Sequence, residues 1–177
     1  MTCIVGLVDD GRVWMGADSR STSASDWCLT TQSPKIIEKD GALFGCAGSP
    51  RIGQLIRYST TLPKRLPDDL DREVFEIVAA IQRGLREGNC IAVDGGAETY
   101  DGTILLGYRG NLFLVSNDYS ITQPRENYQA IGSGSPTALG ALYATKGQEP
   151  ETRIRIALEA AAQTSPYVSG PFVIMSG

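Results

Sequence analysis

The second residue of the chain could act as a nucleophile without help from histidine. Thr2 follows Met1 directly, and loss of methionine before such a small residue would leave a hydroxyl and a free α-amino group on one threonine. That amine has a reference pKa of about 7.7–8.0, so much of it is neutral near physiological pH and can accept the hydroxyl proton. Because the chain has no histidine, Ser-His-Asp and Cys-His nucleophiles and His-ligated metal sites are excluded.

The composition and charge limit the classes of partner and the location that the protein can have. A chain of 177 residues with 42% hydrophobic and 20% charged residues is typical of one soluble globular domain, here residues 1–177. Its net charge of -4 disfavours nucleic acid or an anionic membrane as a partner. No signal-peptide pattern opens the chain, and no run approaches the ~20 apolar residues of a spanning helix. We therefore expect a cytoplasmic protein.

The cysteines and the glycine-rich segment do not indicate a cofactor. Four scattered cysteines, Cys3, Cys28, Cys46 and Cys90, form no CxxC pair, so we expect reduced, mostly buried thiols rather than a zinc site. Residues 132–134, Gly-Ser-Gly, could be a plain turn or an anion-binding loop before a helix. Because the segment lacks the lysine of a P-loop, any use of ATP must lie in a partner.

Two blocks of short strands alternate with two pairs of helices. Turn signals and β-rich runs predict strands at 1–8, 12–18, 27–31, 35–38, 42–47, 103–108, 112–116 and 167–175, with a loop at 19–25. Helical spacing and capping residues predict helices at 50–59, 70–85, 135–145 and 149–163, with Gly88 able to close the second. This order predicts an α+β fold in which two antiparallel sheets pack face to face and helices cover both outer faces.

Several motifs occur in an order that resembles the proteasome β-subunit family. The segment Gly16-Ala17-Asp18-Ser19-Arg20-Ser21-Thr22 resembles its GADxRxT motif, and the following matches are Lys35, Gly45-Cys46-Ala47-Gly48 and Ile131-Gly132-Ser133-Gly134. The length and the threonine after Met1 are similar to the HslV-type peptidases. The resemblance implies an N-terminal nucleophile (Ntn) hydrolase fold, the four-layer αββα sandwich, which agrees with the layers expected from the strands and helices.

The resemblance also implies a role for each matched residue. Thr2 would be both nucleophile and, through its free amine, general base. Lys35 would favour the neutral form of that amine, and Asp18 would hold Lys35 charged and in position. The N–H of Gly48 would donate to the oxyanion, and Ser133 would support the amine. Thr22 would bind the substrate main chain. Cys46 would line a pocket for a medium-sized apolar side chain.

The carboxyl-terminal part departs from the family pattern. The family commonly has an aspartate three residues before a serine. Here Ser169 is retained as a candidate catalytic residue, but Pro166 stands where the aspartate would fall. The stretch between Lys35 and Gly48 is also shorter than in HslV-type enzymes.

The family resemblance predicts a threonine endopeptidase that cuts unfolded proteins or peptides without a metal or organic cofactor. It further implies a homo-oligomeric ring, stacked in pairs, and a separate ATP-dependent unfoldase. With Met1 attached, the Thr2 nitrogen is an amide and cannot serve as the base. Two alternatives stay open: a catalytically inactive ring or assembly protein, and an Ntn amidase acting on a small amide.

Overall fold

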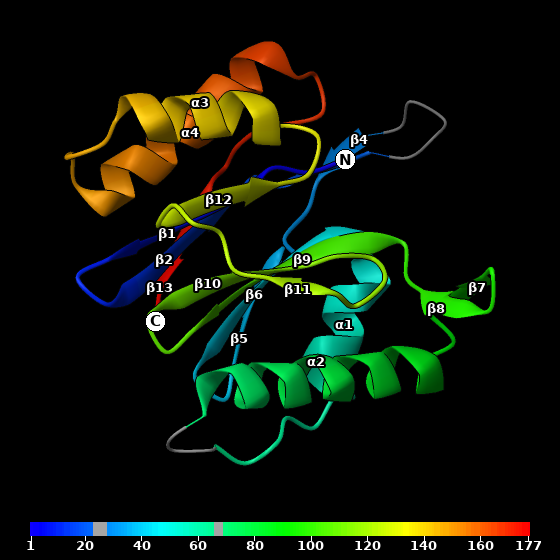
Figure 1. The fold of residues 1–177 in the computed structure, drawn as a ribbon. Helices are drawn as coiled ribbons and strands as arrows, with labels where there is room; N and C mark the ends of the chain where they lie inside the picture. Colours follow the sequence, from blue (N-terminus) through cyan, green and yellow to red (C-terminus); the bar gives the residue numbers. More distant parts are fainter. Residues whose placement is uncertain (23–27, 66–68) are drawn as a thin grey trace.

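Two antiparallel sheets face each other between two pairs of helices (Figure 1). The computed structural model describes residues 1–22, 28–65 and 69–177. The first sheet consists, in spatial order, of β12 (Tyr128–Ile131), β1 (Ile4–Asp9), β2 (Arg12–Ala17) and β13 (Val173–Ser176). The second consists of β11 (Ile121–Thr122), β10 (Asn111–Val115), β9 (Gly102–Tyr108), β6 (Ala42–Gly48) and β5 (Ile36–Lys39).

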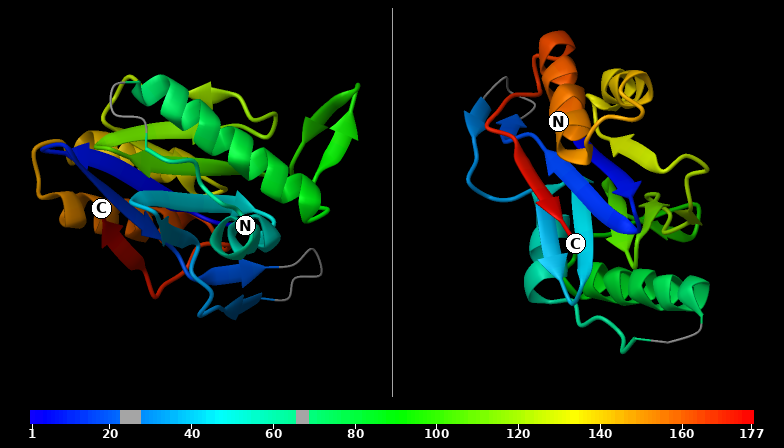
Figure 2. Two further views of the ribbon diagram at one scale, coloured as in Figure 1. Left: turned by 90° about the horizontal axis from the view of Figure 1, so that it is seen from below. Right: turned by 90° about the vertical axis from the view of Figure 1, so that its left-hand side faces the viewer.

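The helices of the described residues cover the outer faces of the two sheets (Figure 2). Helices α1 (Pro50–Tyr58) and α2 (Leu70–Glu87) pack against the second sheet, and α3 (Ser135–Ala144) and α4 (Pro150–Thr164) pack against the first. Helix α1 begins where Ser49 caps it and Pro50 supplies a preset φ angle, and Asp69 caps α2 by accepting from the Arg72 N–H at 2.9 Å. The expected αββα arrangement is confirmed.

The apolar residues between the sheets make a core of their own. Ile4 and Met15 from the first sheet meet Leu43 and Leu105 from the second, and none of the four is more than 2% exposed. Separate clusters lie under each helix pair. Each sheet is therefore buried on both faces, which holds the ends of β2 and β6 in a fixed relation.

The first hairpin follows its turn residues. Strands β1 and β2 pair antiparallel from Ile4↔Ala17 to Asp9↔Arg12. The turn residues Asp10 and Gly11 both have positive φ, 47° and 70°, as a two-residue hairpin loop requires. The expected hairpin is confirmed, although its first strand begins at Ile4 rather than at Met1.

Some predicted strands were wrong at their ends, and several strands of the structure were not predicted. The final strand begins at Val173, not at residue 167, because Pro171 cannot donate to a sheet and the preceding residues turn. In the expected loop at 19–25, residues Arg20–Thr22 form β3, which pairs with β4 (Cys28–Thr30); residues 23–25 and Trp27 lie outside the described residues. The missed strands are β11, β12 and the hairpin of β7 (Ala92–Asp94) with β8 (Ala97–Thr99).

Candidate active site

Thr2 lies just before β1 and is clamped by the segment between β12 and α3. The residue is only 6% exposed. Its amide donates to Ser133 Oγ at 3.4 Å, and its carbonyl accepts from Ser133 Oγ and from the Gly134 N–H, both at 3.3 Å. Gly132 has a φ of +89°, and a Cβ at this position would collide with the Thr2 carbonyl oxygen. Only glycine therefore fits at position 132.

A buried carboxylate at the end of β2 fixes the lysine that approaches Thr2. Asp18 Oδ1 accepts from Lys35 Nζ at 2.7 Å and from the Cys3 N–H at 2.9 Å, and its Oδ2 accepts from the Arg20 N–H at 3.0 Å. Lys35 Nζ also donates to the Arg20 carbonyl at 2.6 Å and to the Met1 carbonyl at 3.5 Å. The ammonium thus lies beside the peptide bond between Met1 and Thr2, and the Asp18 carboxylate balances its charge.

Burial shifts the ionisation of the groups around this junction. The pKa of Lys35 is lowered, mainly by desolvation, and the hydrogen bond and charge of Asp18 oppose that shift. Burial, reinforced by the Asp18 charge, raises the pKa of the Cys3 thiol to about 12. Burial also raises the pKa of Cys46 to about 12. Both thiols stay protonated near neutral pH, which leaves the Thr2 hydroxyl without a competing thiolate.

Gly48 ends β6 in a conformation that a side chain would not fit. Its φ is +114°, and a Cβ would collide with the backbone of Asp101 and Gly102 on the neighbouring strand. The residue is exposed and lies directly before Ser49, the N-cap of α1. The backbone at this point therefore lies beside the positive end of a helix, an environment that favours negative charge.

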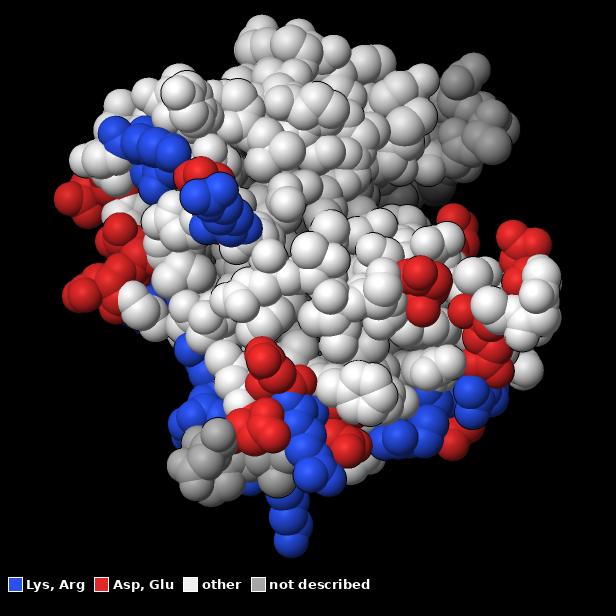
Figure 3. Space-filling model, in the orientation of Figure 1, with Lys and Arg blue, Asp and Glu red and all other residues white. Residues whose placement is uncertain are grey.

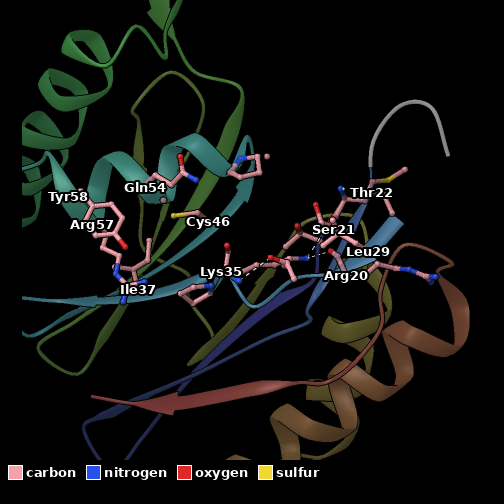
Figure 4. A pocket seen from close by; sticks show the side chains of 18 residues that line it. Arg20, Ser21, Thr22, Leu29, Lys35, Ile37, Cys46, Gln54, Arg57 and Tyr58 are labelled. Carbon is pink, nitrogen blue, oxygen red and sulfur yellow. Dashed lines mark hydrogen bonds between the residues drawn. The ribbon is translucent and has the colours of Figure 1, made fainter. Parts of the chain in front are cut away.

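A pocket of about 350 Å³ brings most of the expected site residues together. It is lined by Thr2, Thr22, Lys35, Cys46 and Gly48, and also by Met1, Arg20, Ser21, Leu29, Thr31, Ser33, Pro34, Ile37, Pro50, Gly53, Gln54, Arg57 and Tyr58 (Figure 4). Two further expected residues adjoin it: Asp18 through Lys35, and Ser133 through Thr2.

Ser169 makes no hydrogen bond to Thr2 among the described residues. Its hydroxyl donates to the Gly170 carbonyl at 3.5 Å, and its own carbonyl accepts from the Ser19 N–H at 3.0 Å. Pro166, in the place of the family's aspartate, accepts at its carbonyl from the guanidinium of Arg20. Hydrogen bonds to the carbonyls of Pro166 and Ser169 therefore hold this segment beside the end of β2.

Sequence reasoning missed one wall of the pocket. Helix α1 presents Pro50, Gly53, Gln54 and Arg57 to it, while Ile52, Leu55 and Ile56 face the core. The spacing of three and four residues places the first set on one face of the helix. That spacing is visible in the sequence, but it indicates a wall of the pocket only when α1 is known to lie beside Cys46.

The described part of the chain contains neither a cluster of metal-ligating side chains nor a membrane-spanning helix. No group of three or more His, Cys, Asp or Glu residues lies close enough to hold a metal ion in residues 1–22, 28–65 and 69–177. Within the same ranges, no helix has the length and apolar character needed to cross a membrane.

The sandwich of two antiparallel sheets between helical layers is the fold of the proteasome-type Ntn hydrolases. More specifically, the fold is HslV-like. The ATP-dependent protease subunit HslV of Caldicellulosiruptor saccharolyticus is 23% identical over 179 residues, which cover 98% of this chain and 97% of that protein. No family model matches the chain.

Solved structures agree with this assignment of the fold. BPH of Thiobacillus denitrificans in complex with epoxomicin superposes with a TM-score of 0.83 at 21% identity, covering 99% of this chain and 98% of that one. The eukaryotic HslV of Trypanosoma brucei has a TM-score of 0.72 at 17% identity and covers 99% and 98% of the two chains. The family resemblance and the fold expected from the sequence are thus confirmed.

Proposed function

We propose that the protein is a threonine peptidase that uses Thr2 after removal of Met1. One observation carries the proposal: Thr2, the Lys35–Asp18 ion pair and Gly48 meet at a single pocket of about 350 Å³. The likeness to the protease subunit HslV and to BPH, which was solved with epoxomicin bound, supports the choice of peptide bonds as the target.

In the first half of the proposed reaction, Thr2 is acylated. Its Oγ forms a bond to the scissile carbonyl carbon, while its α-amine takes the hydroxyl proton. The negative charge that develops on the carbonyl oxygen is stabilised by the Gly48 N–H at the amino end of α1. The C–N bond then breaks, the α-amine gives its proton to the departing amine, and an ester on Thr2 remains.

In the second half, water hydrolyses the ester. The α-amine takes a proton from the water, whose oxygen bonds to the ester carbon. The bond to Thr2 Oγ breaks, and the hydroxyl recovers its proton. One turnover consumes the peptide bond and one water, and it regenerates Thr2 with its hydroxyl and its free amine.

The surrounding residues tune the amine and hold the substrate in this proposal. Lys35, kept charged by Asp18 at 2.7 Å, disfavours a second positive charge on the Thr2 amine and so keeps that amine neutral. Ser133 Oγ, 3.4 Å from the Thr2 nitrogen, orients it. Thr22 binds the substrate backbone. This role is supported by the hydrogen bond that Thr22 Oγ1 accepts from the Met1 nitrogen at 3.3 Å. Cys46 lines the pocket, and Ser169 supports the segment behind Asp18.

The proposal extends to assembly. We infer that residues 1–177 form a single domain, that copies of it make a homo-oligomeric ring stacked in pairs in the cytoplasm, and that a separate ATP-dependent unfoldase supplies unfolded chains. The likeness to HslV, an ATP-dependent protease subunit, supports this extension.

Intact mass spectrometry tests the proposed nucleophile. The chain is purified from cells and weighed before and after incubation with a peptide epoxyketone, a reagent that needs both the free amine and the hydroxyl of threonine. We expect a chain without Met1 that gains one stoichiometric adduct, and a Thr2→Ala variant that gains none. A chain that keeps Met1 and takes up no reagent would overturn the proposal and leave a ring or assembly role.

A rate comparison separates the peptidase from an amidase. Peptide reporters and small acyl amides are offered to the same preparation, and we expect cleavage of the peptides. Hydrolysis of the small amides alone would instead identify an Ntn amidase that uses the same Thr2 chemistry.

A further inference from the structure

The pocket at Thr2 is positively charged, although the chain as a whole is acidic. Three residues that line it are cationic, Arg20, Lys35 and Arg57, and no described residue that lines it is Asp or Glu. The chain has a net charge of -4, and on the face shown in Figure 3 acidic and basic side chains intermix over α2. The local excess of positive charge therefore belongs to the pocket and not to the surface in general.

Two of the three cations are occupied by partners within the chain. Lys35 forms its ion pair with Asp18 at 2.7 Å. The guanidinium of Arg20 donates to the Pro166 carbonyl and lies 3.6 Å from Cys28 Sγ. Both cationic groups are thereby held by neighbours within the site, although only the charge of Lys35 is neutralised by an ion pair.

Arg57 differs from Lys35 and Arg20 because its guanidinium makes neither an ion pair nor a hydrogen bond to another described residue. Its guanidinium lies 5.6 Å from the ring centroid of Tyr58, and its carbonyl accepts from Lys39 Nζ at 3.1 Å. The contact with an aromatic ring leaves the N–H donors of the guanidinium available to a carboxylate. Arg57 can therefore bind an anion without losing an existing salt bridge.

The wall between Arg57 and Lys35 is apolar and open. Figure 4 shows Arg57 with Tyr58 and Ile37 at one end of the pocket, and Cys46 between that end and Lys35. Gly53 keeps this wall open, because a Cβ there would press on Ile37 Cδ1 at 3.0 Å. Cys46 therefore lies between the Arg57 end of the pocket and Lys35, whose Nζ contacts the Met1 carbonyl next to Thr2 (Figure 4).

We infer that this pocket selects an acidic side chain, glutamate in particular, on the residue before the scissile bond. The methylene groups of glutamate would contact the Cys46 and Ile37 wall, and its carboxylate would pair with Arg57. The shorter side chain of aspartate would leave its charge against the apolar wall. The inference rests on the proposed function, and it differs from the apolar preference expected from Cys46 alone.

Three epoxyketones that differ only in this side chain test the inference. Reagents with Glu, Gln or Leu at the position next to the warhead are compared by the rate at which each adds to the chain, followed by intact mass. We expect Glu to react about tenfold faster than Gln, which corresponds to ~1.4 kcal/mol. The ratio should fall as salt is raised, since salt screens a partly exposed ion pair.

Two arginine variants of α1 assign the preference. Arg57→Gln should bring the Glu-to-Gln ratio close to one. Arg51→Gln removes the same charge from the same helix, but Arg51 does not line the pocket and its guanidinium donates to the Gly88 carbonyl at 3.3 Å. The Arg51→Gln variant should keep the ratio of the unaltered protein.

The same experiment separates failure of the inference from failure of the proposed function. Equal rates with Glu and Gln, a faster reaction with Leu than with Glu, or an unchanged ratio in Arg57→Gln would overturn the inference while leaving Thr2 as the nucleophile. Absence of an adduct with all three reagents would overturn the proposed function and the inference with it.

Discussion

Replacing Asp18 with Asn tests how the site holds its lysine. The Asp18 side chain has no exposed surface and the Lys35 side chain is 12% exposed. The substitution keeps the shape but removes the negative charge from a buried pair, a change that typically costs about 3–5 kcal/mol. In addition, an amide NH₂ would face either the Lys35 ammonium or the Arg20 N–H, both of which are donors.

Lys35 can relieve part of that cost by releasing its proton. Its pKa already lies below the usual value because of burial, and loss of the Asp18 charge would lower it further. We therefore expect Asp18→Asn to lower the free energy of unfolding by about 3 kcal/mol, at the lower end of the range for a broken buried pair. Urea denaturation followed by circular dichroism, at one protein concentration, measures the change.

A double variant supplies the control. Asp18→Asn combined with Lys35→Met removes both charges, so it should be more stable than Asp18→Asn alone by about 1–2 kcal/mol, because no unpaired charge stays buried. A loss below about 1 kcal/mol for Asp18→Asn, or a double variant no more stable than the single one, would refute the view that this ion pair organises the site.

Two further predictions concern the clamp on Thr2 and the thiols. Gly132→Ala should destabilise the chain by about 2–4 kcal/mol in urea denaturation, whereas Gly147→Ala should cost only about 1–2 kcal/mol; both glycines have a φ of +89°, but only Gly132 has a neighbour that a Cβ would meet, so equal losses would contradict the clamp. At pH 8, iodoacetamide should modify the exposed Cys28 well before Cys46, whose pKa is raised to about 12, and modification of Cys46 should increase as the pH rises. Peptide mass mapping measures the order, and equal rates at the two cysteines would show that Cys46 is not shielded.

Much of the fold could be predicted because local signals agree with it. Asp10 and Gly11 fix the first hairpin through their positive φ angles, and Ser49 with Pro50 marks the start of α1. The order of strands and helices was then sufficient to indicate two sheets between helical layers. Signals of this kind work because each depends on a few adjacent residues.

Strand β12 and the Arg57 wall could not be predicted by the same means. Tyr128–Ile131 is a strand because it pairs with β1, from Leu7↔Tyr128 to Ile4↔Ile131, and four residues carry little preference of their own. Arg57 has the sequence signature of an ordinary basic residue in the last turn of a helix. Its place in the pocket depends on how α1 lies across Cys46, which no local pattern specifies.

The clamp on Thr2 also has a consequence for the order of folding. Thr2 and its partner Ser133 are 131 residues apart along the chain, and the segment that carries Ser133 follows β12, the strand that pairs with β1. Contacts between such distant residues form slowly, because the entropy cost of closing a long loop comes before any favourable free energy from the contacts. A chain that is still emerging or partly folded therefore carries the Thr2 hydroxyl without its surroundings, and the proposed nucleophile is assembled only when the first sheet is complete.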